Sequence, residues 1–173
     1  GDKVVLMYNG VIQQIGPARE LYLKPKNKFV ATFLGNPSMN IFNAKLEKRG
    51  DNVYAKTDKF SVKLLPQDAN QPSIQSHLGK EVFLGIRPES FEDIDCVVEI
   101  KVDPENVISV MVDVYEPMGA SAYLTWFEGD TKYTAEVDSH SEARAGKEVK
   151  LHVDPRGIHL FDKETEGAIL VRA

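Results

Sequence analysis

The chain has 173 residues, of which 42% are hydrophobic and 27% are charged, a composition ordinary for a globular protein of one or two domains. It contains no apolar run near the roughly 18 residues that a membrane-spanning helix needs, and no signal-peptide pattern opens it. Cys96 is the only cysteine, so an intrachain disulfide is excluded and a reducing compartment is favoured.

The net charge of −5 is unevenly distributed along the chain. Residues 1–35 hold five basic and two acidic side chains, which leaves the remaining residues with a net charge of −8. Neutralising the phosphates of a nucleic acid requires clustered Lys and Arg. The acidic part of the chain therefore argues against nucleic acid as a partner.

The first 35 residues predict a hairpin followed by two short helices. Asn9-Gly10 between two β-prone runs is the strongest short hairpin signal, because a type I′ turn needs positive φ at both central positions. Pro17 is expected as a first helical residue, Asn27 as the cap of the second helix and Gly35 as its stop. In chain order the predicted elements are strands 3–8 and 11–15 and helices 18–24 and 28–34.

From Ile41 onward the apolar residues recur with a period of two, which predicts strands. Pro66–Ser76, with two prolines, is expected to be an irregular polar loop. Many short strands with few helices indicate a barrel or a sandwich. The predicted strands are Ile41–Leu46, Val53–Lys56, Phe60–Leu65, Glu81–Arg87, Val97–Val102, Val107–Tyr115, Ala120–Phe127, Lys132–Val137 and Lys147–Val153.

Two ten-residue segments of the β-rich region are alike. Gly79–Pro88 aligns without gaps on Gly146–Pro155, with Gly, Lys, Glu, Val, Leu and Pro at matching places. A generic strand between a glycine turn and a proline stop would give part of this likeness. The number of identities favours two structurally equivalent strands within an oligonucleotide-binding-like (OB-like) barrel.

The chain lacks the motifs of nucleotide or metal chemistry. No Gly-x-x-x-x-Gly-Lys-Ser/Thr loop occurs, so no backbone cradle for ATP phosphates is expected. The four histidines lack the spacing of a metal site, and Asp138–Glu142 holds triad residue types in what reads as a polar turn. We therefore expect no catalytic, cofactor or metal residues.

Two other features each allow two interpretations. The fork of Arg87 suits an anion or a carboxylate, or alternatively makes a local salt bridge that orders its loop. Trp126-Phe127 is either an exposed contact patch or, as is usual for an alternating aromatic strand, part of the core.

Taken together, the order of these segments resembles the carbohydrate-importer class of ABC transporter ATP-binding subunits, of the maltose and glycerol-phosphate type. The resemblance extends over essentially the whole chain. It rests on Asp2–Met7, Asn9-Gly10, Gln14–Gly16, Leu21-Tyr22, Pro25, Phe29–Gly35, Pro37–Asn40, Leu84–Glu89 and His159–Asp162.

The resemblance implies a mainly β fold in two parts. Residues 1–35 would be the end of a nucleotide-binding domain, contributing the hairpin and the two helices. Residues 36–173 would form an OB-like (TOBE/MOP-like) regulatory barrel. The implied interdomain junction comprises Gly35, Pro37, Met39 and Asn40. The implied regulatory or dimer contacts are Arg87, Pro88, Glu89, His159 and Phe161.

The resemblance also implies partners and a location. The catalytic motifs, with ATP and magnesium, would belong to a full-length parent ATPase, upstream of Gly1. The subunit would work at the cytoplasmic face of the cell membrane with permease subunits, pair as a homodimer, and bind a regulatory protein or a small effector. The alternative is a molybdate-type domain for small oxyanions.

Two physical expectations accompany these implications. A two-stranded hairpin is marginal in water, so residues 1–35 are expected to be held weakly while residues 36–173 fold alone. A dimer interface in the β-rich region would use exposed apolar side chains, for which Trp126, Phe127 and Phe161 are candidates.

Overall fold

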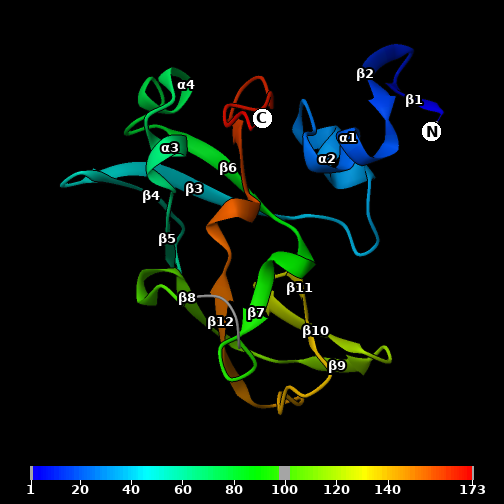
Figure 1. Ribbon diagram of the computed structural model, residues 1–173, viewed down its shortest axis with the longest axis vertical. Coiled ribbons are helices and arrows are strands. Elements are labelled where there is room, and N and C mark those ends of the chain that lie inside the picture. Colours follow the sequence, from blue (N-terminus) through cyan, green and yellow to red (C-terminus); the bar gives the residue numbers. More distant parts are fainter. Residues whose placement is uncertain (1, 98–101, 173) are drawn as a thin grey trace.

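The computed structural model describes residues 2–97 and 102–172, and they form a mainly β structure. Figure 1 shows the N-terminal hairpin and two helices at one side of a larger β-rich body. That body begins at Asn40 and is called the β-domain below. Within the described residues, no helix is long and apolar enough to cross a membrane.

The N-terminal region follows the prediction closely. The hairpin pairs β1 (Lys3–Tyr8) with β2 (Val11–Pro17), and φ is +49° at Asn9 and +76° at Gly10, which confirms the turn. Helices α1 (Ala18–Leu23) and α2 (Lys28–Phe33) follow. The Val30 amide donates to Asn27 Oδ1 at 2.9 Å, so the predicted cap is confirmed. Pro17 is the residue before α1 and not its first residue.

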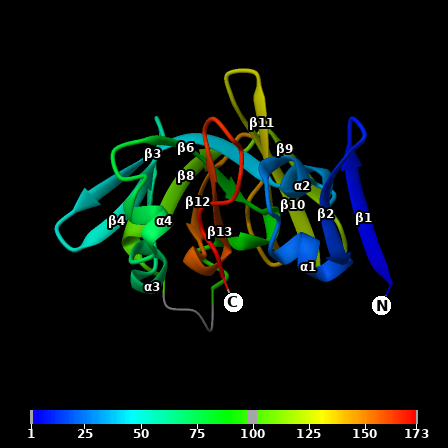
Figure 2. The same cartoon turned by 90° about the horizontal axis from the view of Figure 1, so that it is seen from above.

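Three sheets build the β-domain. Five strands lie in the order β13-β6-β3-β4-β5, and two groups of three lie in the orders β7-β12-β8 and β11-β10-β9. Buried residues of all three sheets belong to one hydrophobic cluster, and Figure 2 shows the same strands from above. The strands are β3 (Asn40–Arg49), β4 (Asn52–Lys56), β5 (Ser61–Lys63), β6 (Glu81–Ile86), β7 (Phe91–Asp93), β8 (Val107–Met111), β9 (Val114–Pro117), β10 (Ser121–Glu128), β11 (Thr131–Asp138), β12 (Glu148–Val153) and β13 (Ile158–Asp162).

Several predicted elements differ from the structure. Pro66–Ser76 contains two short helices, α3 (Pro66–Ala69) and α4 (Pro72–Gln75), because each proline occupies the first helical turn, where its missing N–H costs nothing. The predicted strand 107–115 divides into β8 and β9. The short strands β7 and β13 were not predicted. Of the predicted strand Val97–Val102, residues 98–101 lie outside the described residues.

The core of the β-domain contains aromatic side chains from several strands. Trp126 is only 4% exposed and contacts Phe91 edge to face, and the rings of Phe42 and Tyr133 stack with centroids 4.2 Å apart. Phe161 is completely buried. The expectation that Trp126 and Phe161 offer exposed contact surface is therefore wrong, and Phe127, which is 48% exposed, is the one of the three that faces solvent.

The two similar segments are equivalent strands, as predicted. They form β6, which lies between β13 and β3, and β12, which lies between β7 and β8. Each begins after a glycine with positive φ, Gly79 or Gly146, and ends in a 3-10 turn, η1 (Pro88–Ser90) or η3 (Pro155–Gly157). The short strand after each turn pairs with the other copy: β7 pairs with β12, and β13 pairs with β6. The two halves therefore exchange their last strands.

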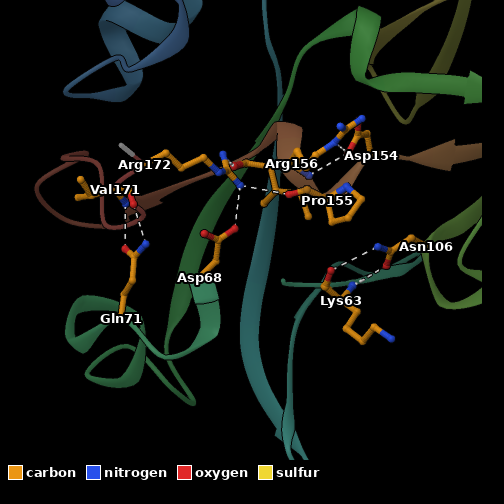
Figure 3. Close-up of polar contacts among 10 residues, drawn as sticks. Lys63, Asp68, Gln71, Asn106, Asp154, Pro155, Arg156, Val171 and Arg172 are labelled. Atoms are coloured by element: carbon orange, nitrogen blue, oxygen red, sulfur yellow. Dashed lines mark hydrogen bonds and ion pairs between the residues drawn. The ribbon is translucent and has the colours of Figure 1, made fainter. Parts of the chain in front are cut away.

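A pair of asparagines extends this repeat. Asn40 lies opposite Ile86 of β6, and its amide exchanges hydrogen bonds with the backbone of Thr134, at 2.8 Å to the carbonyl and 2.9 Å from the N–H. Asn106 lies just before β8, and its amide makes the same double contact with the backbone of Lys63, at 2.6 and 3.3 Å (Figure 3). Each asparagine thus joins one sheet to a strand of another.

The last described residues lie across α3, α4 and η3 (Figure 3). Arg172 donates to the buried carboxylate of Asp68 and to the Pro155 carbonyl, both at 3.1 Å. The side-chain amide of Gln71 makes hydrogen bonds of 2.6 and 3.0 Å with the backbone of Val171. This segment fixes the two short helices to the turn that follows β12.

Candidate functional site at the junction of the helices and the β-domain

Arg87 joins the two N-terminal helices to the end of β6. Its side chain is 4% exposed, and its guanidinium donates to the carbonyls of Tyr22 at 2.8 Å, Leu34 at 3.0 Å and Ala31 at 3.2 Å. These carbonyls lie at or near the C-terminal ends of α1 and α2, where backbone acceptors lack helical partners and a cation is favoured. Burial lowers the pKa of the Arg87 guanidinium. We call this arrangement the Arg87 clasp.

Neither sequence interpretation of Arg87 describes its role. Within the described residues, the acceptors of its hydrogen bonds are main-chain carbonyls, and it makes no salt bridge. Its guanidinium carbon lies 3.8 Å from the centre of the Tyr22 ring, a cation–π contact. The positive charge is therefore engaged inside the protein and is not presented to an anion.

Tyr22 is held from a second direction by the turn after Arg87. Its hydroxyl donates to the carboxylate of Glu89 in η1. Burial and this hydrogen bond raise the pKa of Tyr22 to about 12. Gly35 leaves room for the contact, since a Cβ there would lie 3.2 Å from the Tyr22 ring and 3.3 Å from an Arg87 nitrogen, at a φ of +98°. Arg87 and Glu89 thus both hold one residue of α1, Tyr22.

The turn between β13 and the final segment holds the start of α2. The Lys28 amide donates to the Glu166 carbonyl, and the Ala168 amide donates to the Lys26 carbonyl, both at 2.9 Å. Lys28 also pairs with the Glu166 carboxylate at 3.0 Å. Helix α2 is therefore fixed near both its ends, by this turn and by Arg87.

The remaining predicted residues lie in the linker, in η1 and against α2. Met39, Ala31 and Phe161 form a small buried cluster, and the ring of His159 lies parallel to that of Phe161 with centroids 6.4 Å apart. A Cβ at Gly85 would lie 2.4 Å from the Met39 sulfur, so this cluster depends on a glycine in β6. Pro88 is buried in η1. Pro37 lies in the segment between α2 and β3, beside Asn36, to which it is joined by a cis peptide bond.

His159 predicts a pH dependence of stability. Burial, with the positive charges of Arg172 and Arg87, lowers the pKa of His159 to about 3, below the unfolded value near 6.5. The stability it contributes is complete above pH 6.5 and is lost as the pH falls from 6.5 towards 3. At about 1.4 kcal/mol per pH unit, we expect a loss of up to about 2 kcal/mol by pH 5. Urea unfolding at pH 7.5 and 5.0 measures this loss of stability. If the His159→Gln variant lost as much stability between these pH values, the assignment to His159 would be contradicted.

Sequence reasoning missed Tyr22 at this junction and Asn106 elsewhere in the β-domain. Tyr22 was part of a recognised segment, but its double contact joins residues more than sixty positions apart, which no local pattern reveals. Asn106 had a signal: it follows Asn40 by almost the spacing that separates Gly146 from Gly79. Extending the internal alignment upstream with a gap of one residue would have paired the two asparagines. Within the described residues, no group of three or more His, Cys, Asp or Glu is placed to hold a metal ion.

The sequence of the chain is similar to proteins of one known family. Residues 35–91, from the end of α2 to the start of β7, match the family model of the MalK OB fold domain. The trehalose/maltose import ATP-binding protein MalK of Thermococcus litoralis is 35% identical over 169 residues, which are 98% of this chain and 44% of that protein. The sulfoquinovosyl glycerol transport ATP-binding protein SmoE of Agrobacterium fabrum is 34% identical, over 97% of this chain and 44% of that protein.

A solved structure is also similar at low identity. The cytoplasmic molybdate-binding protein ModG, with molybdate bound, gives a TM-score of 0.49 at 18% identity, covering 70% of this chain and 94% of that one. The chain spans less than half the length of the two curated relatives above. Their similarity nevertheless extends over almost the whole of it, from the hairpin to the final segment. The chain belongs to the family of proteins that carry the MalK OB fold domain, and almost its whole length is similar to the ATP-binding proteins named above.

Proposed function

We propose that this chain is the regulatory and pairing part of an ATP-binding subunit in an ABC importer for sugars or related solutes. The Arg87 clasp is the observation that carries the proposal. A regulatory domain must be mechanically joined to the domain it regulates, and three carbonyls of the N-terminal helices converge on one buried guanidinium of the β-domain. In this proposal residues 1–35 belong to the ATPase and residues 36–173 form the regulatory domain.

We propose that the rest of such a subunit attaches at the hairpin. Val5 pairs across the sheet with Ile15, and Met7 with Ile12, and each of these four side chains is about half exposed. A two-stranded sheet with bare apolar side chains is marginal alone, and clustered exposed apolar side chains mark an interaction surface. We propose that the remainder of the ATP-binding subunit covers it. Through that remainder the subunit would contact permease subunits at the cytoplasmic face of the membrane.

The first prediction is that the chain itself neither binds nor hydrolyses ATP. Phosphate-loop backbone amides and a lysine are the usual means of holding a nucleotide, and the sequence contains no such loop. Isothermal titration of the chain with magnesium-ATP should show no saturable heat. The MalK protein of Thermococcus litoralis serves as the positive control. Saturable binding at micromolar concentrations would contradict the prediction.

The second prediction is a weak homodimer formed through the β-domain. A dimer with a dissociation constant in the micromolar range or weaker corresponds to about 8 kcal/mol or less. Phe127, exposed near the end of β10, is the aromatic side chain we propose at its interface. Sedimentation over a hundredfold concentration range should show reversible association, weakened by Phe127→Asp but not by Val11→Asp in the hairpin. A single monomeric species up to millimolar concentration would contradict it.

The electrostatics of the cavity beside β7 argue against the oxyanion alternative. Among the described residues, this cavity of about 500 Å³ is lined by five carboxylates and by no basic side chain. Like charges would repel a molybdate or sulfate ion there. These carboxylates are Glu89, Glu92, Asp93, Glu136 and Asp138.

A further inference from the structure

A second cavity lies beside the junction and has a different chemistry. It is a groove of about 430 Å³ between the linker residues Asn36 and Pro37 and the outer face of the β9-β10-β11 sheet. Figures 1 and 2 both show the segment between α2 and β3 passing beside this sheet. The volume falls within the usual range for small-molecule sites. The sheet residues that line it are Glu116, Met118, Tyr123, Thr125, Lys132 and Thr134. We call this cavity the linker groove.

Most polar side chains of the linker groove have no hydrogen-bond partner among the described residues. Within residues 2–97 and 102–172, no hydrogen bond or ion pair engages the side chains of Asn36, Glu116, Tyr123, Thr125 or Lys132. Together they offer ammonium, amide and hydroxyl donors and carboxylate, amide and hydroxyl acceptors. Donors and acceptors together with an aromatic ring match a molecule that carries many hydroxyl groups.

The charge of the linker groove selects against ionic ligands. Among the described residues, the groove is lined by one acidic side chain, Glu116, and one basic side chain, Lys132, so their formal charges cancel. A phosphate or molybdate would be attracted by one and repelled by the other. The acidic cavity beside β7, by contrast, would favour cations. A neutral ligand therefore fits the linker groove best.

The linker groove is connected to the Arg87 clasp from both walls. On one wall, Asn36 and Pro37 follow Leu34, whose carbonyl accepts from Arg87. On the other, the backbone of Thr134 is bound by Asn40, which also donates to the Ile86 carbonyl next to Arg87 at 2.9 Å. A ligand touching both walls would favour the arrangement in which the helices are docked on the β-domain.

We propose that the linker groove binds a neutral mono- or disaccharide, and that binding stabilises the docked position of α1 and α2. This inference rests on the proposed function, for which it supplies an effector class. The sugar would then act on the ATP-binding subunit through the same junction that Arg87 holds.

Methyl NMR spectroscopy of the chain tests the proposal with maltose, trehalose and glucose, each titrated to 10 mM. We expect saturable shifts with a dissociation constant below about 1 mM for at least one sugar. The shifts should be centred on the methyl groups of Met118, Thr125 and Thr134, which line the groove. Sodium molybdate, sodium phosphate and spermidine are the ionic probes. No saturable shift with any sugar, or stronger binding of an ionic probe at these methyl groups, would overturn the proposal.

Three variants locate the site. Lys132→Gln and Thr125→Val should each weaken sugar binding at least fivefold, while Lys56→Gln, an exposed lysine on β4 outside the groove, should leave it unchanged. Equal effects of Lys132→Gln and Lys56→Gln would overturn the assignment. Hydrogen exchange of the α1 and α2 amides in the Arg87→Met variant is a separate measurement without sugar. It tests whether Arg87 joins the helices to the β-domain, as the proposed function requires. Loss of the sugar result alone would therefore leave the proposed function standing.

Discussion

Replacing Arg87 with methionine should lower the free energy of unfolding by about 3 kcal/mol and release α1 and α2 from the β-domain. Methionine keeps much of the apolar volume but removes the donors to Tyr22, Ala31 and Leu34. Hydrogen bonds to a charged donor contribute about 1.5–3 kcal/mol each, and buried acceptors left without partners add a desolvation cost. The estimate is conservative because water would reach some of the carbonyls once the helices move.

Hydrogen exchange and urea unfolding measure the two parts of this effect. In the variant, amides in residues 18–34 should exchange faster while those of β3 and β6 stay protected. Arg156→Met is the control, because Arg156 is 67% exposed and its side chain, among the residues described, pairs only with Asp154. Equal stability of the two variants, or unchanged exchange in the helices, would show that Arg87 does not hold the junction.

The same contacts alter the expectation for residues 1–35. The hairpin contacts mainly the helices, through the buried cluster of Leu6, Leu21 and Val30. The helices themselves are fixed to the β-domain by the Arg87 clasp and by the turn at Glu166. In the unmodified chain we therefore expect rapid exchange in residues 3–17 and slow exchange in α2. A weakly held segment would then end before the helices and not at Gly35.

Replacing Asn40 with alanine should cost about 3 kcal/mol, and replacing Asn106 about 2 kcal/mol. The Asn40 amide makes three buried hydrogen bonds, and its loss leaves backbone groups of Ile86 and Thr134 without partners. Asn106 makes two, to a lysine whose backbone is half-buried. Urea unfolding at pH 7 measures both.

A matched control for the asparagines is available on the same strand. Asn43 is exposed on β3, so Asn43→Ala should change the free energy of unfolding by less than about 0.5 kcal/mol. If Asn40→Ala behaves like Asn43→Ala, the asparagine bridge between the sheets carries no stability. If only Asn106→Ala leaves the free energy of unfolding unchanged, the two asparagines occupy equivalent positions but do not contribute equally to stability.

Turn and capping residues predicted the elements whose ends they determine. The hairpin follows from the positive φ that Asn9-Gly10 accepts, and the start of α2 follows from the cap at Asn27. The alternation in β10 predicted a strand but left open which face is buried, and Trp126 proved to lie inside. The three-residue strand β7 is too short to show a period, so its pairing with β12 was not predictable.

The candidate site was predictable as a set of residues but not as an arrangement. Gly35, Met39, Arg87 and Phe161 do lie around one junction. The partners of Arg87, however, are carbonyls, which every residue carries and no sequence pattern distinguishes. The residue type suggested an ionic role for Arg87. Only the fold shows that its guanidinium donates to carbonyls at the ends of helices.

The exchange of last strands between the two halves has a consequence for synthesis on the ribosome. β6 receives its partner β13 only after about seventy further residues have been made. At roughly 5–20 residues per second, one side of β6 remains unpaired for about 4–14 seconds. An open strand edge is a template for pairing with another chain. The nascent chain is therefore most exposed to misassembly during this interval, when a chaperone would have the greatest effect on yield.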